Sequence, residues 1–158
     1  MNIGPYRFIL GASLCSLLAM TNALACSCMP HPEDPEAAVK QAWPEADAIV
    51  SGTVVSSSIV KETEGVEQVE VVLEVRRRWK GPAGPRLKVR TPTSSAACGY
   101  NFEQQRQYVV FARRDPASNV YSTGLCSLTQ PAIDTAPLAE ALGRMELKED
   151  AADRAVQK

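Results

Sequence analysis

The middle of the chain alternates apolar and polar residues with a period of two. Its clearest example is 69–76, where Val69, Val71, Leu73 and Val75 alternate with residues that are mostly charged. This alternation is typical of a strand with one buried face, and we expect Trp79 to continue that face. We expect four further strands: 48–55, which is rich in β-branched residues, 87–91, where apolar residues and threonine alternate with Lys88 and Arg90, and the segments 108–112 and 120–125.

Two segments carry helix signals instead. Asp34 precedes Pro35 and an alanine-rich stretch, which predicts a short capped helix that ends at Pro44. After Pro131 the apolar residues recur at helical spacing, with Asp134 or Thr135 as the cap. The shared face of this helix consists of Leu138, Ala141, Leu142 and Met145. We expect the charged residues 148–158 to form a frayed tail.

The order of these elements predicts the fold class. Polar or Pro/Gly-rich turns at 62–65 and 80–85 separate short strands, and a helix follows the last of them. An all-β protein with flanking helices fits this pattern. We predict a closed five-stranded barrel of the oligonucleotide/oligosaccharide-binding (OB) type, with a short N-terminal helix and a C-terminal helix.

Residues 1–25 have the features of a secretory signal peptide. Arg7 is their only charge, an apolar run extends over 8–20, and Ala23-Leu24-Ala25 has the small-x-small pattern of a cleavage site. We therefore expect a secreted or periplasmic protein whose folded domain covers residues 26–147. A lipoprotein signal that acylates Cys26 is the alternative. The apolar run is shorter than the roughly 18 to 20 residues of a membrane-spanning helix.

The charge balance and the residue types exclude several functions. The chain has 17 Lys and Arg against 18 Asp and Glu, which argues against nucleic acid as the partner. Its one basic run, 76–78, fits a solvated strand edge. His31 is the only histidine, and no nucleophile–base pair or phosphate loop accompanies it. We therefore do not expect an enzyme.

Four cysteines remain after the signal peptide, which takes Cys15 with it. They are Cys26, Cys28, Cys98 and Cys126. An even number in an exported chain predicts two disulfides. A Cys26–Cys28 bridge is sterically poor, which leaves two crossing arrangements. The spacing does not match the paired cysteines of structural zinc sites, so we expect no metal or other cofactor of the protein's own.

Cleavage after Ala25 would make Cys26 the first residue, with a free α-amino group beside its own carbonyl. An amine and a carbonyl on one residue can chelate a metal ion in a five-membered ring. A disulfide through the same residue could hold this chelating group rigid.

The chain resembles the amino-terminal domain of the tissue inhibitors of metalloproteinases, a netrin-like group of OB-fold domains. Four features carry the resemblance along 26–131: a Cys-Ser-Cys start, Ala46-Asp47 before the first strand, Trp79-Lys80-Gly81-Pro82, and the loop Ser94-Ser95-Ala96-Ala97-Cys98-Gly99. The first and last of these are the most specific. The resemblance implies the disulfides Cys26–Cys98 and Cys28–Cys126, which would turn the amino terminus into a rigid wedge.

The resemblance also implies a mechanism, the inhibition of a zinc metalloendopeptidase by a monomeric inhibitor. The Cys26 amine and carbonyl would bind the partner's zinc, and Ser27 would enter its specificity pocket. Cys28, Met29 and Pro30 would occupy the substrate groove. On the other side of the cleft, the loop residues Ser95, Ala96 and Ala97 would make contact.

The sequence departs from the family pattern in three ways. Trp43 stands where the family usually has the first cysteine of a third disulfide, the second disulfide-rich domain is absent, and the turn at 62–65 is short. The alternative function is a netrin-like protein-binding module that inhibits no protease, with or without a lipid at Cys26.

Overall fold

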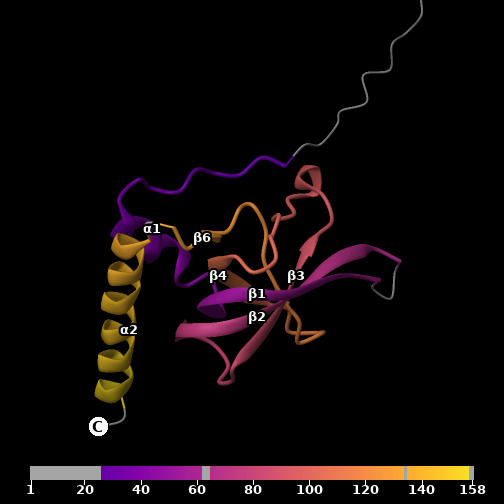
Figure 1. Ribbon diagram of the computed structural model, residues 1–158. Coiled ribbons are helices and arrows are strands. Elements are labelled where there is room, and N and C mark those ends of the chain that lie inside the picture. Colours follow the sequence, from indigo (N-terminus) through magenta and orange to yellow (C-terminus); the bar gives the residue numbers. More distant parts are fainter. Residues whose placement is uncertain (1–25, 62–64, 134, 157–158) are drawn as a thin grey trace, which may run out of the picture.

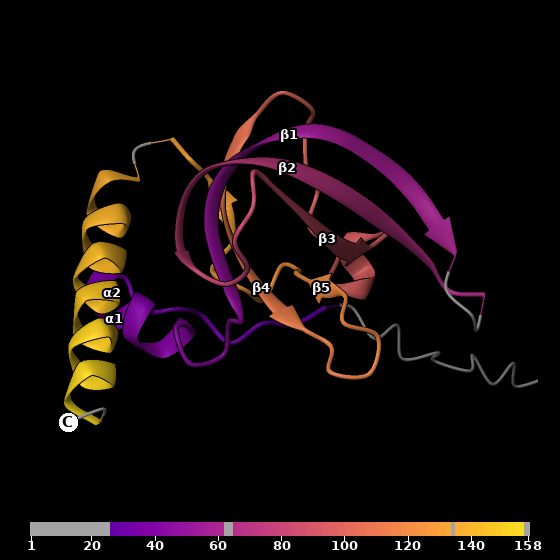
Figure 2. The ribbon, with the colours of Figure 1, turned by 90° about the horizontal axis from the view of Figure 1, so that it is seen from below.

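The computed structural model describes residues 26–61, 65–133 and 135–156. A β-barrel occupies one side of the molecule, and two helices stand side by side at the other (Figure 1). Figure 2 shows the same separation from a second direction. The predicted signal peptide, residues 1–25, lies outside the described residues.

The barrel is a closed ring of five strands. β1 (Ala48–Lys61), β2 (Glu67–Lys80) and β3 (Arg86–Pro92) form an antiparallel run, and β4 (Gln107–Arg114) closes the ring on β1. Between β3 and β4 lies the two-residue strand β5 (Tyr121–Ser122), parallel to β3 and antiparallel to β4. This order, β1-β2-β3-β5-β4 and back to β1, is that of an OB-type barrel.

Two strand predictions need correction. The predicted strand 120–125 pairs only at Tyr121 and Ser122, because the chain leaves the sheet at Thr123 and turns toward Cys126. A further short strand, β6 (Gln130–Pro131), pairs with β4 and was not predicted. Both differences arise where the chain bends to bring Cys126 to the amino-terminal segment.

The buried side chains form two clusters on the two sides of β1 and β4. Inside the barrel lie residues such as Val50, Leu73, Val89 and Val110. Ile49, Val109 and Phe111 alternate with them and face the helices. Trp79 belongs to this second cluster, so our expectation that it continues the buried face of Val71 and Leu73 is wrong. The pairing of β1 with β2 shifts register between Ile49 and Val50 and again between Ser51 and Gly52. Each shift is a bulge in β2 that changes which of its side chains face the inside of the barrel.

The first helix, α1 (Pro35–Ala42), forms as predicted. The Asp34 carboxylate accepts a hydrogen bond of 2.8 Å from the amide of Ala37, and Pro35 occupies the first turn. Ala38, Val39 and Ala42 are buried, and Val39 and Ala42 belong to the second cluster. Trp43, at the end of the helix, is 5% exposed.

The second helix, α2 (Ala136–Val156), is longer than predicted. Leu138, Ala141 and Leu142 are buried, and Met145 packs against the same cluster, as the apolar pattern predicted. The helix continues as far as Val156, through most of the segment 148–158 that we expected to fray, and the last two residues lie outside the described part of the chain. Lys148 and Arg144 form ion pairs with Glu36 of α1, at 3.5 and 3.4 Å, so both lie against α1. In the described part of the chain, neither helix is long and apolar enough to cross a bilayer.

Candidate functional site: the disulfide-bonded amino terminus

Three segments that are distant in the sequence meet at the predicted wedge. They are the amino-terminal segment 26–30, the loop around the 3-10 helix η1 (Ser95–Ala97), and the loop 122–128. A disulfide joins Cys26 to Cys98 and another joins Cys28 to Cys126. These are the pairs that the family resemblance implies. The two cysteines of the Cys-Ser-Cys motif are therefore bonded to different loops, Cys26 to the η1 loop and Cys28 to the loop 122–128.

Backbone hydrogen bonds connect the same three segments independently of the disulfides. The Cys26 nitrogen donates to the Ala96 carbonyl at 3.1 Å, and the Leu125 amide donates to the Cys98 carbonyl at 2.9 Å. The loop that contains Ala96 and Cys98 is therefore hydrogen-bonded to both of the other segments. The chain at Cys26 is therefore held both by a disulfide and by a backbone hydrogen bond.

The η1 loop has a compact structure of its own. The Ser94 hydroxyl and carbonyl both accept hydrogen bonds from the Ala97 amide, at 3.3 and 3.1 Å, and the Ser94 carbonyl also accepts one from Gly99 at 2.9 Å. Cys98 has a left-handed φ of 63°, which turns the chain back after η1. A Cβ on Gly99 would lie 2.1 Å from the Pro92 carbonyl oxygen, so the loop closes only with glycine there.

Hydrogen bonds between side-chain hydroxyl groups hold the conformation of the loop 122–128. Thr123 Oγ1 donates to the Phe111 carbonyl at 2.9 Å and lies 3.0 Å from Ser127 Oγ and 2.9 Å from Thr129 Oγ1. Ser127 Oγ in turn donates to the Gly124 carbonyl at 2.8 Å. A Cβ on Gly124 would come within 2.6 Å of the Cys98 carbonyl oxygen. The network therefore positions Gly124 directly against the Cys98 loop.

The predicted contact residues are exposed. Ser27, Cys28, Met29 and Pro30 all lie on the surface, as do Ser95, Ala96 and Ala97, while Cys26 is partly buried between the two loops. Met29 is 79% exposed; a single exposed apolar side chain is common on protein surfaces. The fold thus brings the two predicted contact segments next to each other, joined at Cys26 and Ala96.

A comparison with protein-family models identifies the chain. The model described as tissue inhibitor of metalloproteinase matches residues 24–140, from just before Cys26 into α2. The chain belongs to the tissue inhibitor of metalloproteinase family. Family membership points to inhibition of metalloproteinases rather than to catalysis. A comparison with curated proteins found no match.

The family match covers all of the predicted contact residues but only the first quarter of α2. The helix from residue 141 onward lies beyond the matched range. It nevertheless packs on α1 and covers the second buried cluster.

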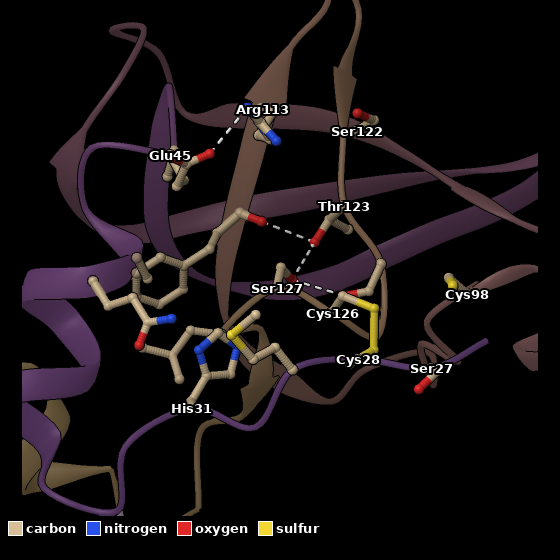
Figure 3. Close-up of a pocket in the computed structure, with 17 residues that line it drawn as sticks. Ser27, Cys28, His31, Glu45, Cys98, Arg113, Ser122, Thr123, Cys126 and Ser127 are labelled. Carbon is tan, nitrogen blue, oxygen red and sulfur yellow. Dashed lines mark hydrogen bonds and ion pairs between the residues drawn. A yellow bond between two sulfur atoms is a disulfide. The ribbon is translucent and has the colours of Figure 1, made fainter.

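A cavity of about 530 Å³ lies beneath the amino-terminal segment. His31 and Met29 line it from that segment, Glu45 and Arg113 form an ion pair of 3.0 Å at its rim, and the loop 122–128 forms a further wall (Figure 3). Both ring nitrogens of His31 are buried and have no hydrogen-bond partner among the described residues. We predicted His31 to be a loop residue, and it is one, in the segment before α1.

Sequence reasoning missed the contribution of loop 122–128. We predicted a strand over 120–125, but the hydroxyl groups of Thr123, Ser127 and Thr129 form a hydrogen-bond network on either side of Cys126. Hydroxyl-rich runs beside a glycine are a turn signal. That signal could have identified the loop, although not its contact with Cys98.

Proposed function

We propose that this protein is a secreted inhibitor of zinc metalloendopeptidases that acts through the α-amino and carbonyl groups of Cys26. Removal of residues 1–25 creates the free amine. The amine and carbonyl then bind the catalytic zinc of the protease in place of its water. Catalytic zinc sites keep such an open position beside three protein ligands.

The single observation that carries the proposal is the double restraint on Cys26. Its sulfur is bonded to Cys98 and its nitrogen lies 3.1 Å from the Ala96 carbonyl oxygen. A chelating group that is already rigid loses little conformational entropy on binding, which favours affinity. The unperturbed pKa of an α-amine, about 7.7–8.0, makes the neutral form that binds metal accessible near neutral pH.

The neighbouring residues supply the rest of the proposed interface. Ser27 enters the specificity pocket, and Cys28, Met29 and Pro30 lie along the substrate groove. Ser95, Ala96 and Ala97 contact the opposite side of the cleft, where their small side chains allow close approach of the backbone. All of these positions except Cys26 are exposed, so the interface needs no rearrangement of the barrel.

Two measurements on the exported protein test the proposal. Mass spectrometry of the intact protein identifies its first residue, and inhibition is then titrated against a panel of zinc endopeptidases. We expect an unmodified Cys26 terminus and stoichiometric inhibition of at least one protease. An acylated terminus, or a correct terminus without inhibition across the panel, would overturn the proposal and favour a netrin-like binding module.

A further inference from the structure

The cavity beneath the amino-terminal segment combines polar groups at two ends with an apolar lining. His31 lies at one end, and the Glu45–Arg113 ion pair lies at the other (Figure 3). The lining also includes the buried apolar side chains of Ala42 and Phe111. The volume of about 530 Å³ is within the range of sites that hold small molecules. The cavity therefore has the size and the mixed lining of a ligand site.

The imidazole of His31 needs hydrogen-bond partners that the rest of the cavity does not supply. Both ring nitrogens are buried, and neither has a partner among the described residues. A neutral imidazole has one donor and one acceptor, and unpaired buried polar atoms cost free energy. The hydroxyl groups of Thr123 and Ser127 are already hydrogen-bonded to each other and to backbone carbonyls. A ligand with a hydroxyl group at one end would meet the need of His31.

The ion pair at the other end is open to a ligand. Arg113 Nη2 and Glu45 Oε2 are 3.0 Å apart, and the side chains are 71% and 64% exposed. Within the described part of the chain, neither side chain has another ion-pair or hydrogen-bond partner. An ion pair this exposed contributes little to stability. The two charges can therefore separate to accept a ligand without weakening the fold.

The balance of charge at this end favours a zwitterion. A carboxylate alone would pair with Arg113 but would leave Glu45 unpaired beside a second anion, and an amine alone would leave Arg113 unpaired. A group with both charges pairs with both residues. The apolar lining favours a ring between the two polar ends. We propose that the cavity binds a free α-amino acid with a hydroxylated aromatic side chain, of which tyrosine is the simplest.

Each part of this ligand has a partner in the cavity. The α-carboxylate bonds to Arg113 and the α-ammonium group bonds to Glu45. The ring packs on the apolar lining, and its hydroxyl group bonds to His31. The site is independent of the proposed inhibition, because it uses no atom of Cys26 and is measured without a protease. Either proposal can fail while the other stands.

Ligand-observed NMR on the exported, disulfide-bonded protein tests the proposal with L-tyrosine as the probe. We expect one saturable site with a Kd of about 1 mM or tighter, which a ligand of this size reaches at ordinary efficiency. N-acetyl-L-tyrosine lacks the ammonium group and L-tyrosine amide lacks the carboxylate. Each should bind at least about tenfold more weakly, as for the loss of a charged hydrogen bond. L-phenylalanine lacks only the hydroxyl group and should bind about two- to tenfold more weakly.

Variants of the lining identify the partners. Glu45→Gln and Arg113→Gln change exposed side chains, and each should weaken L-tyrosine binding by at least about tenfold. Arg106→Gln is the matched control, because it breaks an ion pair of 2.7 Å with Glu103 that lies outside the cavity lining. It should bind like the parent. His31→Leu should weaken L-tyrosine by the same factor as loss of the hydroxyl group and leave L-phenylalanine unchanged, since both changes remove one hydrogen bond.

Thermal melts follow the fold of each variant, and the ligand series on the parent protein needs no variant at all. The proposal is wrong if L-tyrosine does not saturate a site below its solubility limit. It is also wrong if the N-acetyl and amide forms bind as well as the free amino acid, or if folded Glu45→Gln and Arg113→Gln variants bind like the parent. Equal binding of L-tyrosine and L-phenylalanine would overturn the assignment of a hydroxylated ring to His31.

Discussion

The indole Nε1 of Trp43 donates a hydrogen bond of 3.1 Å to Glu149 Oε2, 106 residues later in the chain. Lys80 approaches Trp43 from the barrel, with its Nζ 5.5 Å from the centre of the ring and 3.1 Å from the Trp43 carbonyl oxygen. By the family resemblance, Trp43 stands where a cysteine of a third disulfide would be expected. In this chain the buried Trp43 side chain connects the end of α1 to the helix α2 through Glu149 and to the barrel through Lys80.

Truncation of this side chain should therefore destabilise the protein strongly. We expect Trp43→Ala to lower the free energy of unfolding by about 3–5 kcal/mol, the usual cost of removing a buried Trp. Leu147→Ala on the same helix, at a side chain that is 67% exposed, is the control and should cost less than about 0.5 kcal/mol. Urea unfolding of the three proteins checks both values. Equal stability of the Trp43 variant and the parent would show that α2 does not replace the missing bridge.

The elements whose signals are local could be predicted from the sequence. Asp34 and Pro35 define the start of α1 by capping and by a fixed φ, and both act within one turn. The alternation of Val71 and Leu73 with charged residues likewise needs no tertiary information. The disulfide pairing came from the family resemblance, since the spacing of the cysteines alone left two arrangements.

The features that sequence reasoning missed depend on contacts between distant residues. The bulges in β2 that turn Trp79 toward the helices are defined only by its pairing with β1. Residues 148–156 look like part of a solvated tail because five of the nine are charged. They are helical because Lys148 pairs with Glu36 and Glu149 accepts from Trp43, and because Ala151 and Ala152 favour helix.

The pH dependence of stability should show the effect of one carboxylate on the barrel surface. Glu70 on β2 lies 3.3 Å from both Lys88 Nζ and Arg90 Nε on β3. Its partial burial would raise its pKa, but hydrogen bonds and the charges of Lys88 and Arg90 outweigh this and hold the pKa below its ordinary value of 4.5. The folded state therefore favours the ionised form. This contribution is present above the unfolded-state pKa and is lost as pH falls through the folded-state pKa.

We accordingly expect the stability difference between the parent and Glu70→Gln to shrink as pH falls from neutral to about 3. Denaturant unfolding at a series of pH values measures this difference. Glu74→Gln is the matched control, because the Glu74–Arg76 pair is 3.9 Å apart and more than half exposed on both sides, where ion pairs contribute little. A constant difference for Glu70→Gln across this range would show that the pair does not stabilise the barrel.

The close approach of Gly124 to Cys98 gives a prediction that links packing to inhibition. A Cβ at Gly124 would lie 2.6 Å from the Cys98 carbonyl oxygen, so Gly124→Ala must push the two loops apart. We expect a loss of about 1–3 kcal/mol of stability, as for overpacking, together with weaker inhibition. Gly143→Ala is the control, since its Cβ would make only an ordinary contact of 3.6 Å with Arg77.

Because Gly143 lies inside the helix α2, Gly143→Ala should raise the free energy of unfolding by about 0.5–1 kcal/mol and leave inhibition unchanged. Thermal melts and inhibition titrations of the two glycine variants make the comparison. If Gly124→Ala is destabilised but inhibits like the parent, the contact between Gly124 and Cys98 is not needed for inhibition.

Ser27 should matter for binding but not for folding. Its side chain is exposed between two anchored cysteines, and we propose that it enters the protease's specificity pocket. We expect Ser27→Gly to weaken inhibition while stability changes by less than about 1 kcal/mol. Ser118→Gly, at an exposed serine whose hydroxyl contacts only its own turn, should leave inhibition as it is. Ser27 would be structural if Ser27→Gly unfolded the protein.

Addition of one Ala before Cys26 tests the proposed mechanism most directly. The Cys26 nitrogen then becomes an amide, whose lone pair is delocalised into the peptide bond and is a very poor metal ligand. The extra residue also needs space between Cys26 and the metal. The two disulfides and the contact with Ala96 can still form, so the melting temperature should hardly change.

Inhibition by the Ala-extended protein should fall at least about a hundredfold, or about 2.7 kcal/mol, since tenfold corresponds to 1.4 kcal/mol. One Ala added after Lys158 is the control and should inhibit like the parent. The assay pairs inhibition of a responsive zinc endopeptidase with a melt and a non-reducing peptide map of each sample. A map with the same two disulfides is required, so that lost inhibition reflects the nitrogen and not the fold. Equal inhibition by the native and the extended amino terminus would rule out chelation by Cys26 and leave the exposed side chains of the wedge as the source of binding.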